Sequence, residues 1–513
     1  MARRSRTLGF KRLRRIKVLF DNNFGATREK ILNLPVTASN NASMDSMASA
    51  RQVADLPGPK GVPVFGNMLQ IESLQFHRVL EDWAREFGPM YKFRMGRKAI
   101  VVISDNTLIA NLLRDRPDAL RRSSRTSRIL SELGTSGVFT DEGDEWRKQR
   151  KLVMRGLTPE VIKRFFPTMV SMTERLRLRW LKAVTEGRPV DVLRDLKAYA
   201  LDITIGLAMG QDINALEHDD NPLQRDIEEI FYRVARRMTS PFAYWRYFKL
   251  PVDRAADANA ERIGHAVRGF IAQTRQELEA HPERRSKPSN MLEALLIARD
   301  EPNSEFTDEH VIGNAVTMVF AGEDTTSNTI AWLLGFAARH PQVASAIAAE
   351  TDAILGDHRV LQDFAGLEQF HYTDAATNEA MRIKPVAPVL GLETNKEMMV
   401  GDLLAPPGTL VLACLRHSGE LTNEFPEPDT FRPERWLGDS ALAGDSPTRK
   451  LFPFGGGPRF CPGRFLAMAE VRMVTSMIAR NFTLSYDQDA PPIKELFTFT
   501  MTPSALPIKL TLR

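Results

Sequence analysis

One short stretch constrains this chain more than any other: "LFPFGGGPRFCPGRFLAMAE", residues 451–470, places a lone cysteine between a glycine-rich loop and a helix-like run. Glycine-rich loops often bind phosphates. This one lacks both the Gly-Lys-Ser/Thr ending of a Walker loop and the third glycine of a dinucleotide fingerprint. Pro458 also removes a backbone donor that a phosphate site would use. The loop therefore serves the cysteine rather than a phosphate.

A disulfide is a poor explanation for this cysteine. The 513 residues contain only two cysteines, and the other, Cys414, lies in the apolar strand-like run "TLVLACL". So few cysteines in so long a chain indicate a reducing compartment. Backbone amides beyond Cys461, and a helix beginning near Gly463, favour the thiolate form of Cys461. We expect Cys461 to bind a metal, and Cys414 to be a small buried side chain.

Composition indicates a large globular domain. The chain has a mass of 57.8 kDa with 43% hydrophobic and 26% charged residues, which is an ordinary globular composition. Residues 56–513 contain neither a Pro-, Gly- or Ser-rich linker nor an internal repeat, so we expect a single catalytic domain there. The net charge of +5 is modest, and no dense basic run with interleaved aromatic residues points to nucleic acid.

Residues 1–55 have a different character. The first 20 residues carry eight Arg or Lys and no acid, and the stretch up to Arg51 is rich in Asn, Ser, Ala and Met. This extension is an untranslated upstream sequence with the true start at Met44 or Met47, an Arg-rich transit peptide, a basic amphipathic anchor, or a disordered tail. No run reaches the roughly 18 apolar residues of a membrane span. We expect a cytoplasmic monomer, with peripheral membrane attachment or organelle targeting as the alternative.

Hydrophobic periodicity predicts a mainly α protein with a smaller β-rich portion. Residues 155–380 are almost all helix-like, and strand signals lie at 90–104, near 409–415 and near 506–512. The most unusual helix is 308–340, stopped by Pro341. Its ends are apolar, but "GEDTTSN" interrupts its centre. Charges inside a buried helix are costly unless they are paired or used, although a solvent-facing polar stripe is an alternative for Glu323.

Thr325 at this centre can donate to the carbonyl of Ala321, bend the helix and open a groove beside Gly322.

Five motifs, in order along the chain, resemble those of the cytochrome P-450 haem-thiolate enzymes. "FGGGPRFCPGR" (454–464) looks like the cysteine loop of that family, "AGEDTT" (321–326) its oxygen-activation helix and "EAMR" (379–382) its Glu-x-x-Arg helix. "WRKQR" (146–150) and "FRPERW" (431–436) complete the set. The resemblance runs from about Leu56 to the C-terminus. It implies the P-450 fold, with haem between the long central helix and the cysteine loop, in a soluble, bacterial-like member without a fused reductase.

The resemblance also implies roles for individual residues. Cys461 would be the axial ligand of the iron in haem b (iron protoporphyrin IX), with Phe454 near its sulfur. Trp146 and Arg150, four apart on a helix, and Arg459 would hold the propionates. Many family members carry another arginine where this chain has Leu392, so a third propionate contact is in doubt.

Two further sets complete the expected site. Ala321 and Gly322 would line the haem, and Thr325 with Asp324 would deliver protons to dioxygen as it is reduced. A buried ion-pair network of Glu379, Arg382 and Arg435 would support folding and haem retention. Losing one member of such a network costs about 3–5 kcal/mol.

Electrons would come from NAD(P)H through a separate partner, because only about fifty residues follow the cysteine. An acidic ferredoxin, flavodoxin or reductase would dock on positive charge near the cysteine, from "WRKQRK", Arg449, Lys450 and Arg464. A solvated basic face is the alternative.

The predicted function is a monooxygenase that uses dioxygen to hydroxylate or epoxidise a hydrophobic substrate such as a fatty acid or terpenoid. By family analogy, residues 120–134, 385–391 and 497–501 would line the pocket, and arginines at 121, 122, 125 and 128 could receive a carboxylate. The aromatic run 242–248 is a lid, a membrane contact or core. A peroxygenase or isomerase on the same fold, and a non-catalytic haem sensor or carrier, remain alternatives.

Overall fold

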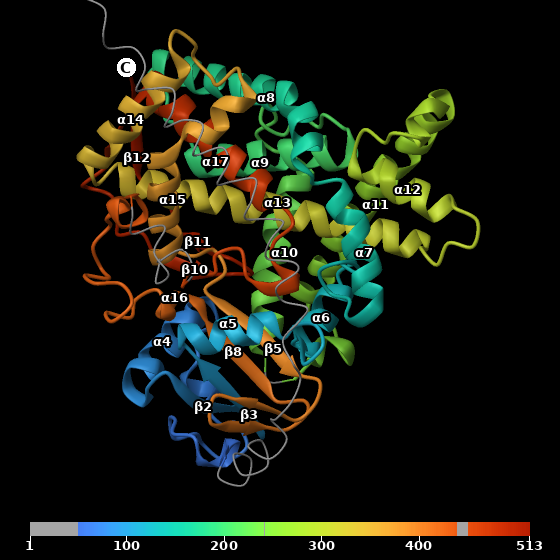
Figure 1. Cartoon of the computed structure of the whole chain (residues 1–513), viewed down its shortest axis with the longest axis vertical. Helices are drawn as coiled ribbons and strands as arrows, with labels where there is room; N and C mark the ends of the chain where they lie inside the picture. Colours follow the sequence, from blue (N-terminus) through green and yellow to red (C-terminus); the bar gives the residue numbers. More distant parts are fainter. Residues whose placement is uncertain (1–49, 241, 439–449) are drawn as a thin grey trace, which may run out of the picture. The chain divides into compact units, whose positions relative to one another are not determined.

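Helices make up most of the described chain and a smaller β portion packs against them, which confirms the fold class predicted from the sequence (Figure 1). The computed structural model describes residues 50–240, 242–438 and 450–513. Residues Gln52 to Arg513 form one compact unit. The Arg-rich segment 1–20 and the candidate start residues Met44 and Met47 lie outside the described residues, so the predictions for this extension stay untested.

The helices and strands have the following bounds. The helices are α4 (Phe76–Phe87), α5 (Asn106–Arg114), α6 (Ser124–Ser131), α7 (Gly143–Arg155), α8 (Pro159–Thr185), α9 (Val192–Met209), α10 (Pro222–Thr239), α11 (Pro251–Ala280), α12 (Met291–Asp300), α13 (Asp308–Ala337), α14 (Pro341–Leu355), α15 (His371–Ile383), α16 (Leu415–Ser418) and α17 (Arg464–Asn481). The strands are β1 (Arg51–Gln52), β2 (Met90–Met95), β3 (Lys98–Ile103), β4 (Leu120–Arg122), β5 (Val389–Thr394), β6 (Met398–Val400), β7 (Leu403–Ala405), β8 (Leu410–Cys414), β9 (Phe482–Tyr486), β10 (Glu495–Phe497), β11 (Met501–Pro503) and β12 (Ile508–Leu512).

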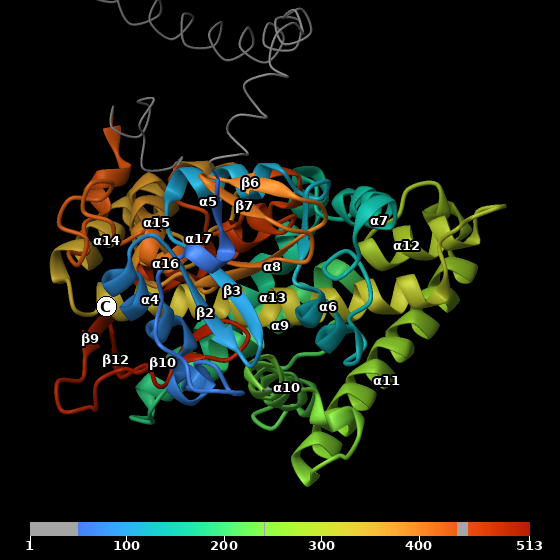
Figure 2. The same cartoon turned by 90° about the horizontal axis from the view of Figure 1, so that it is seen from below.

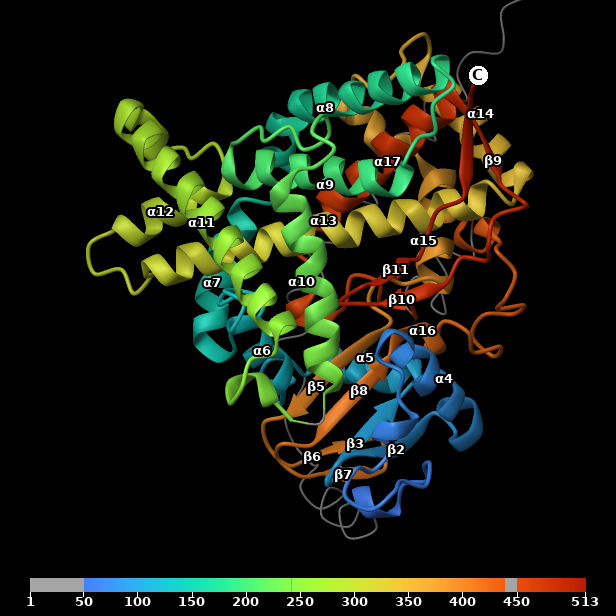
Figure 3. The ribbon, with the colours of Figure 1, turned by 180° about the vertical axis from the view of Figure 1, so that it is seen from behind.

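Helix α13 is the long helix expected around residues 308–340. Its start is fixed by Thr307, whose hydroxyl accepts from the His310 N–H, and Asp308 and Glu309 in its first turn suit the positive end of the helix dipole. Most of its residues from Val311 onward are buried. Figures 1 and 3 show it crossing the middle of the molecule, with α8, α9 and α17 on one side and the sheet on the other.

The main sheet has the strand order β2-β3-β8-β5-β4, in which only β3 and β8 run parallel. Side chains alternate between its two faces. Val101 and Val411 belong to one apolar cluster and Val102 and Leu412 to another, so both faces of these central strands are buried. Cys414, at the end of β8, is 1% exposed, as expected for a small buried side chain.

Helix α9 lies alongside α13, and the two labels stay adjacent in the view from below (Figure 2). Gly322 on α13 permits this approach. An ideal Cβ there would fall 2.0 Å from Thr204 Oγ1 and 2.8 Å from Thr204 Cβ on α9. The side of Gly322 that faces α9 therefore serves helix packing, so the groove expected beside this residue does not lie on that side.

Replacing Gly322 by alanine tests this close packing. We expect Gly322→Ala to lower the free energy of unfolding by about 1–3 kcal/mol, because the added methyl group must push α9 away. The measurement is urea-induced unfolding followed by circular dichroism. Gly335→Ala on the same helix is the matched control, since its Cβ would meet only Leu506 Cδ1, at 3.4 Å. Equal stabilities in the two variants would contradict the close crossing of α9 and α13.

Candidate functional site

The cysteine loop is pressed against the end of α5. Gly457 has a φ of 62°, and a Cβ at this position would lie 2.1 Å from the Leu113 carbonyl oxygen. Only glycine tolerates both the left-handed conformation and the close approach. The Cys461 N–H donates to the Phe454 carbonyl at 2.8 Å and closes the loop, and Gly463 then caps α17. The chain thus delivers the Cys461 sulfur directly before the N-terminus of a helix.

In the protein chain by itself, burial favours the protonated form of Cys461. It raises the pKa of the thiol, against the backbone amides of Gly463 and Arg464 and the Arg150 guanidinium, which favour the thiolate. From the sequence, only the contributions that favour the thiolate could be recognised, and the opposing effect of burial could not. A metal ion deprotonates a coordinating thiol outright. The half-buried thiol therefore suits a bound metal better than free nucleophilic chemistry.

Arginines from the loop and from α7 meet beside the cysteine. Arg459 Nη2 donates to Glu142 Oε2 at 2.5 Å, and its guanidinium lies 4.4 Å from the centre of the Trp146 ring. Arg150 Nη2 donates to the Phe460 carbonyl at 2.5 Å. The structure thus brings together Trp146, Arg150 and Arg459 around the loop, as expected from the sequence.

Two more arginines, which the sequence analysis did not place here, complete this group. The Arg122 N–H donates to Glu142 Oε1 at 2.8 Å, and Arg122 Nε donates to the Phe139 carbonyl at 2.9 Å. Arg116 is 3% exposed. Burial, together with Arg116 and Arg459, lowers the pKa of Arg122 to about 9. Burial also lowers the pKa of Arg459, to about 10.

This guanidinium cluster, defined as Arg116, Arg122, Arg150 and Arg459, fits the propionates of haem. Its four positive charges face two carboxylates, Glu142 and Asp141, which leaves an excess of two. Within the described residues, Arg116 Nε and Nη2 and Arg459 Nε are buried without a hydrogen-bond partner. Buried donors normally have partners. Two carboxylates arriving with a ligand would satisfy both the donors and the charge.

The register of the sheet explains how Arg122 was missed. Leu392 on β5 is fully buried and can offer no charge, but its partner across the β4–β5 pair is Arg122. A cation is therefore supplied by the neighbouring strand. The sequence signal that could have located Arg122 was the pair Arg121–Arg122. Adjacent residues of a strand point to opposite faces, so these two arginines take different partners. Arg121 turns the other way and pairs with Glu393 at 2.6 Å.

The centre of α13 has an open side. Ala321 is exposed and Thr325 is partly exposed, although Phe320 and Thr326 beside them are buried. Thr325 Oγ1 donates to the Ala321 carbonyl at 2.8 Å, as expected. The helix runs without a break through this point. Ala321 and Thr325 therefore face an internal space.

Asp324 points away from solvent and is 3% exposed. The Thr500 hydroxyl donates to Asp324 Oδ2, and Asn328 Nδ2 donates to Oδ1 at 3.0 Å. Lys197 Nζ on α9 lies 4.0 Å from Oδ1. Burial raises the pKa of Asp324, while Lys197 and these two donors oppose that rise. From the sequence, Thr500 was expected only as part of the pocket-lining segment 497–501, and neither Thr500 nor Lys197 was identified as a partner of Asp324.

A connection from Asp324 towards solvent passes through Lys197. Lys197 Nζ also lies 3.4 Å from Glu228 Oε1 on α10, and the side chains of Lys197 and Glu228 are 13% and 35% exposed. Burial lowers the pKa of Lys197, but Asp324, Glu323 and Glu228 outweigh it and raise the pKa overall. Glu323 is fully buried, and burial raises its pKa well above the usual value. Glu323 is thus not part of a solvent-facing stripe.

The expected ion-pair network of α15 is present. Glu379 Oε1 accepts from Arg382 Nη2 and from Arg435 Nε, each at 2.9 Å, and Trp436 Nε1 donates to Oε2 at 2.8 Å. Glu379 and Arg382 are fully buried. Every charge here has a partner, which is what allows it to be buried.

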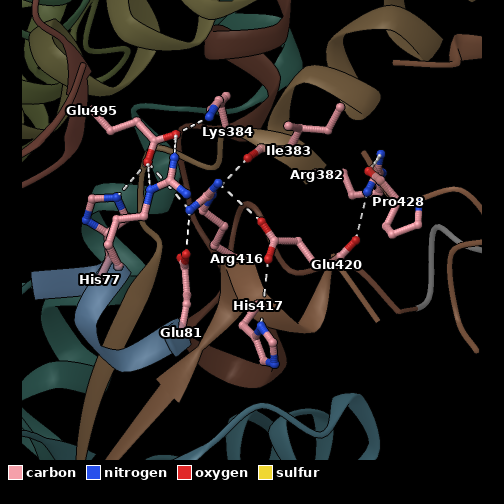
Figure 4. Close-up of polar contacts among 12 residues, drawn as sticks. His77, Glu81, Arg382, Ile383, Lys384, Arg416, His417, Glu420, Pro428 and Glu495 are labelled. Carbon is pink, nitrogen blue, oxygen red and sulfur yellow. Dashed lines mark hydrogen bonds and ion pairs between the residues drawn. The ribbon is translucent and has the colours of Figure 1, made fainter. Parts of the chain in front are cut away.

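A second buried network, absent from the sequence analysis, centres on Glu495 at the start of β10 (Figure 4). His77 Nε2 lies 2.9 Å from Glu495 Oε2, and Arg78 Nε donates to the same oxygen at 2.7 Å. Lys384 Nζ donates to Oε1, and Arg416 lies 3.5 Å away. Burial alone would raise the pKa of Glu495, but these cations lower it strongly. Glu495 is thus an ionised anchor for the β10–β11 hairpin.

Four phenylalanines gather next to the open side of α13. Phe231 stacks on Phe499 with ring centres 5.7 Å apart and contacts Phe320 edge to face at 5.6 Å, and Phe139 contacts Phe499 at 5.9 Å. They come from four separate segments, of which one, 497–501, was predicted to line the pocket. This apolar cluster is suited to a hydrophobic substrate.

A separate cleft of about 590 Å³ opens between α6, α11 and α13. Ile312 and Val316 of α13 lie among its apolar lining residues, and Trp245 and Arg246 border it. Both of these donate to Glu132, at 2.9 and 2.6 Å. The aromatic run 242–248 therefore borders this cleft. Arg125, one of the arginines considered for a substrate carboxylate, instead donates to the carbonyls of Arg237 and Ser240.

The comparisons with known proteins all indicate one family. The family model "Cytochrome P450" matches residues 56–510. The chain is 28% identical to human mitochondrial 25-hydroxyvitamin D-1 alpha hydroxylase, over 87% of this chain and 90% of that protein. It is 26% identical to rat cytochrome P450 4B1 (87% and 88%) and 28% identical to the cytochrome P450 monooxygenase yanC of Aspergillus niger (85% and 84%).

The variant Arg122→Gln tests the fit of the guanidinium cluster. We expect the apoprotein to be no less stable, because a buried and mutually repelling charge is removed. We expect haem loss to become about tenfold faster, because a charge-assisted hydrogen bond contributes roughly 1.5–3 kcal/mol. The measurement is transfer of haem to excess apomyoglobin, followed by absorbance.

Arg121→Gln is the matched control, since its side chain pairs with Glu393 instead. If both variants lose haem at the wild-type rate, Arg122 does not contact a propionate.

Proposed function

Because the chain belongs to the cytochrome P450 family, we propose that Cys461 is the axial ligand of haem b and that the guanidinium cluster around Glu142 holds the propionates. The observation that carries this proposal is the cluster itself, whose excess of two positive charges and unpartnered buried donors lies beside the cysteine loop. The half-buried Cys461, with two backbone amides directed at its sulfur, supports the same assignment.

The chain is a haem-thiolate monooxygenase, which inserts one atom of dioxygen into an organic substrate with electrons derived from NAD(P)H. When bound, thiolate-ligated haem supplies the binding and activation of dioxygen. The protein's own task is to hold the cofactor, position the substrate and deliver protons.

Protons would reach the active site through Asp324. Its carboxylate connects to Lys197 and, beyond that, to the partly exposed Glu228. To pass a proton into the internal space, the Asp324 carboxyl group must turn from Thr500 and Asn328 towards Thr325. The Thr325 hydroxyl donates to the Ala321 carbonyl, so its oxygen is left free to accept a hydrogen bond from that side. An acid beside an alcohol favours the dioxygen-dependent reaction over the peroxygenase alternative.

The substrate would bind against the four phenylalanines that flank the open side of α13. Their lining is apolar, which supports a hydrophobic molecule such as a fatty acid or terpenoid. Arg121 and Arg125 already have partners within the chain, and Arg122 belongs to the guanidinium cluster assigned to the propionates, so these three arginines offer little to a substrate carboxylate.

A separate acidic electron carrier, a ferredoxin, flavodoxin or reductase, would dock near the cysteine loop. Arg464, Lys151 and Arg155 are exposed there and support this docking. Part of the predicted basic face is neutralised: Arg147 pairs with Asp118 and Asp144, and Lys450 with Glu424. Arg449 lies outside the described residues. The docking surface is therefore smaller than the sequence suggested.

We place the protein in the cytoplasm as a monomer, with peripheral membrane or organelle association as the alternative. Within the described residues, no helix is long and apolar enough to cross a membrane. Exposed aromatic side chains of the run 242–248, Phe242, Tyr247 and Phe248, support a peripheral contact.

The direct test of the axial ligand is Cys461→Ala. We expect the reduced wild-type protein exposed to carbon monoxide to show the strongly red-shifted Soret band of thiolate ligation, and the variant to lose it. Cys414→Ala is the control and should keep the band, because Cys414 is buried in the sheet. A normal thiolate spectrum in Cys461→Ala would overturn the assignment.

The proton role is tested by Asp324→Asn and Thr325→Ala. We expect both to bind haem and substrate, but to divert reducing equivalents from product to hydrogen peroxide, with product formation falling about 10²-fold or more when a general acid is lost. The measurement is the ratio of product to peroxide per NAD(P)H consumed. An unchanged ratio in either variant would remove that residue from the mechanism.

A further inference from the structure

The tip of the β10–β11 hairpin joins the substrate pocket to the acid of α13. We propose that Thr500 is a positioning residue: its hydroxyl holds the Asp324 carboxylate, and it does so from the same three-residue turn that presents Phe499 to the substrate. This inference rests on the proposed function, in which Asp324 delivers protons. It adds a residue that the motifs of the sequence did not indicate.

The base of the hairpin is fixed by charge and by the backbone. Glu495 is held by His77, Lys384 and Arg416, as Figure 4 shows, and Arg78 also donates to it. On the other strand, the Met501 N–H donates to the Val386 carbonyl at 2.8 Å, and its carbonyl accepts from Trp332 Nε1 at 3.1 Å. The hairpin is therefore tied to α4, α13 and the segment after α15, so its tip has a defined position.

The tip itself is a short, closed turn. The Thr498 N–H and hydroxyl donate to the Thr500 carbonyl, at 3.0 and 3.2 Å. Between them, Phe499 stacks on Phe231 with ring planes only 6° apart. Thr500 is 3% exposed, and its hydroxyl donates to Asp324 Oδ2. A substrate that packs against Phe499 thus contacts the turn that holds the acid.

Other groups fix the second oxygen of Asp324 but cannot replace Thr500. Asn328 Nδ2 donates to Oδ1, and Asn328 Oδ1 in turn accepts from Thr502 Oγ1 at 2.7 Å. The charged groups facing Asp324 are Lys197 from α9, Glu228 from α10 and Glu323 from α13 itself. Removing the Thr500 hydroxyl would leave the buried Oδ2 without this donor, which disfavours the ionised carboxylate and its orientation.

The test compares three variants: Thr500→Val and Thr500→Ser in the hairpin, and Thr274→Val in α11. Thr274→Val is the matched control, because Thr274 is also buried but its hydroxyl donates to the Phe270 carbonyl of its own helix instead of to the acid. The first measurement is the ratio of product to peroxide per NAD(P)H. The second is the substrate dissociation constant from the optical spin-state change. The third is the infrared carbonyl band of protonated Asp324, assigned by its loss in Asp324→Asn.

We expect Thr500→Val to lower the ratio of product to peroxide about tenfold, which is the loss of one hydrogen bond to a charged group. Its substrate dissociation constant should stay within about twofold of wild type, and the Asp324 band should persist to higher pH. Thr500→Ser and Thr274→Val should both behave like the wild type.

Two outcomes would overturn the proposal and can be told apart from a failure of the proposed function. If Asp324→Asn uncouples the enzyme but Thr500→Val behaves like Thr274→Val, the positioning role is wrong and the proton role stands. If Thr500→Val weakens substrate binding as much as it lowers coupling, Thr500 only shapes the pocket. If Asp324→Asn itself leaves coupling unchanged, the proton role fails, and the positioning role fails with it.

Discussion

Four guanidinium groups held beside a single thiol are the interaction on which the site depends. They come from the segment before α6, from α7 and from the cysteine loop, and within the described part of the chain the carboxylates that oppose them are Glu142 and Asp141. Like charges brought together in a buried place destabilise a chain unless a counter-charge arrives. The excess positive charge of the apoprotein therefore favours binding of a dianion, and in the proposed site the two propionates of haem would supply it while Cys461 would bind the iron. Cofactor binding and folding of this region are linked by the same charges.

Buried charge also organises two other parts of the fold. Glu379 and Glu495 are each fully partnered, and they fix α15 and the β10–β11 hairpin as rigid supports. Asp324 is treated differently: its donors are a hydroxyl and an amide, and its nearest cation is 4.0 Å away. Weaker partners let a carboxyl group turn and exchange a proton, which a tight ion pair would prevent. A buried carboxylate thus serves structure in two places, and in a third place its weaker partners suit the proposed role in proton delivery.

The sequence alone predicted the parts of the site that lie within one short segment. Cys461, the pair Asp324–Thr325 and the pair Glu379–Arg382 are each read from neighbouring residues, and Trp146 with Arg150 from a helical spacing of four, whereas Arg435 came from the family resemblance. Arg122 could not be found this way, because its place depends on the pairing of β4 with β5 opposite Leu392. Thr500 lies 176 residues from Asp324, so only the packed structure joins them. The pKa of Cys461 was misjudged because burial depends on the whole fold.

The most direct measurement compares two affinities of the apoprotein, one for iron protoporphyrin IX and one for the dimethyl ester of that haem. The difference between them measures how much the two propionate charges contribute to binding. The two ligands share the iron and the apolar ring but differ in the two propionate charges. If the guanidinium cluster holds both propionates, the free acid should bind about a hundredfold or more tightly than the ester, as two charge-assisted hydrogen bonds would give. Equal affinities for the two ligands would contradict this explanation of the site.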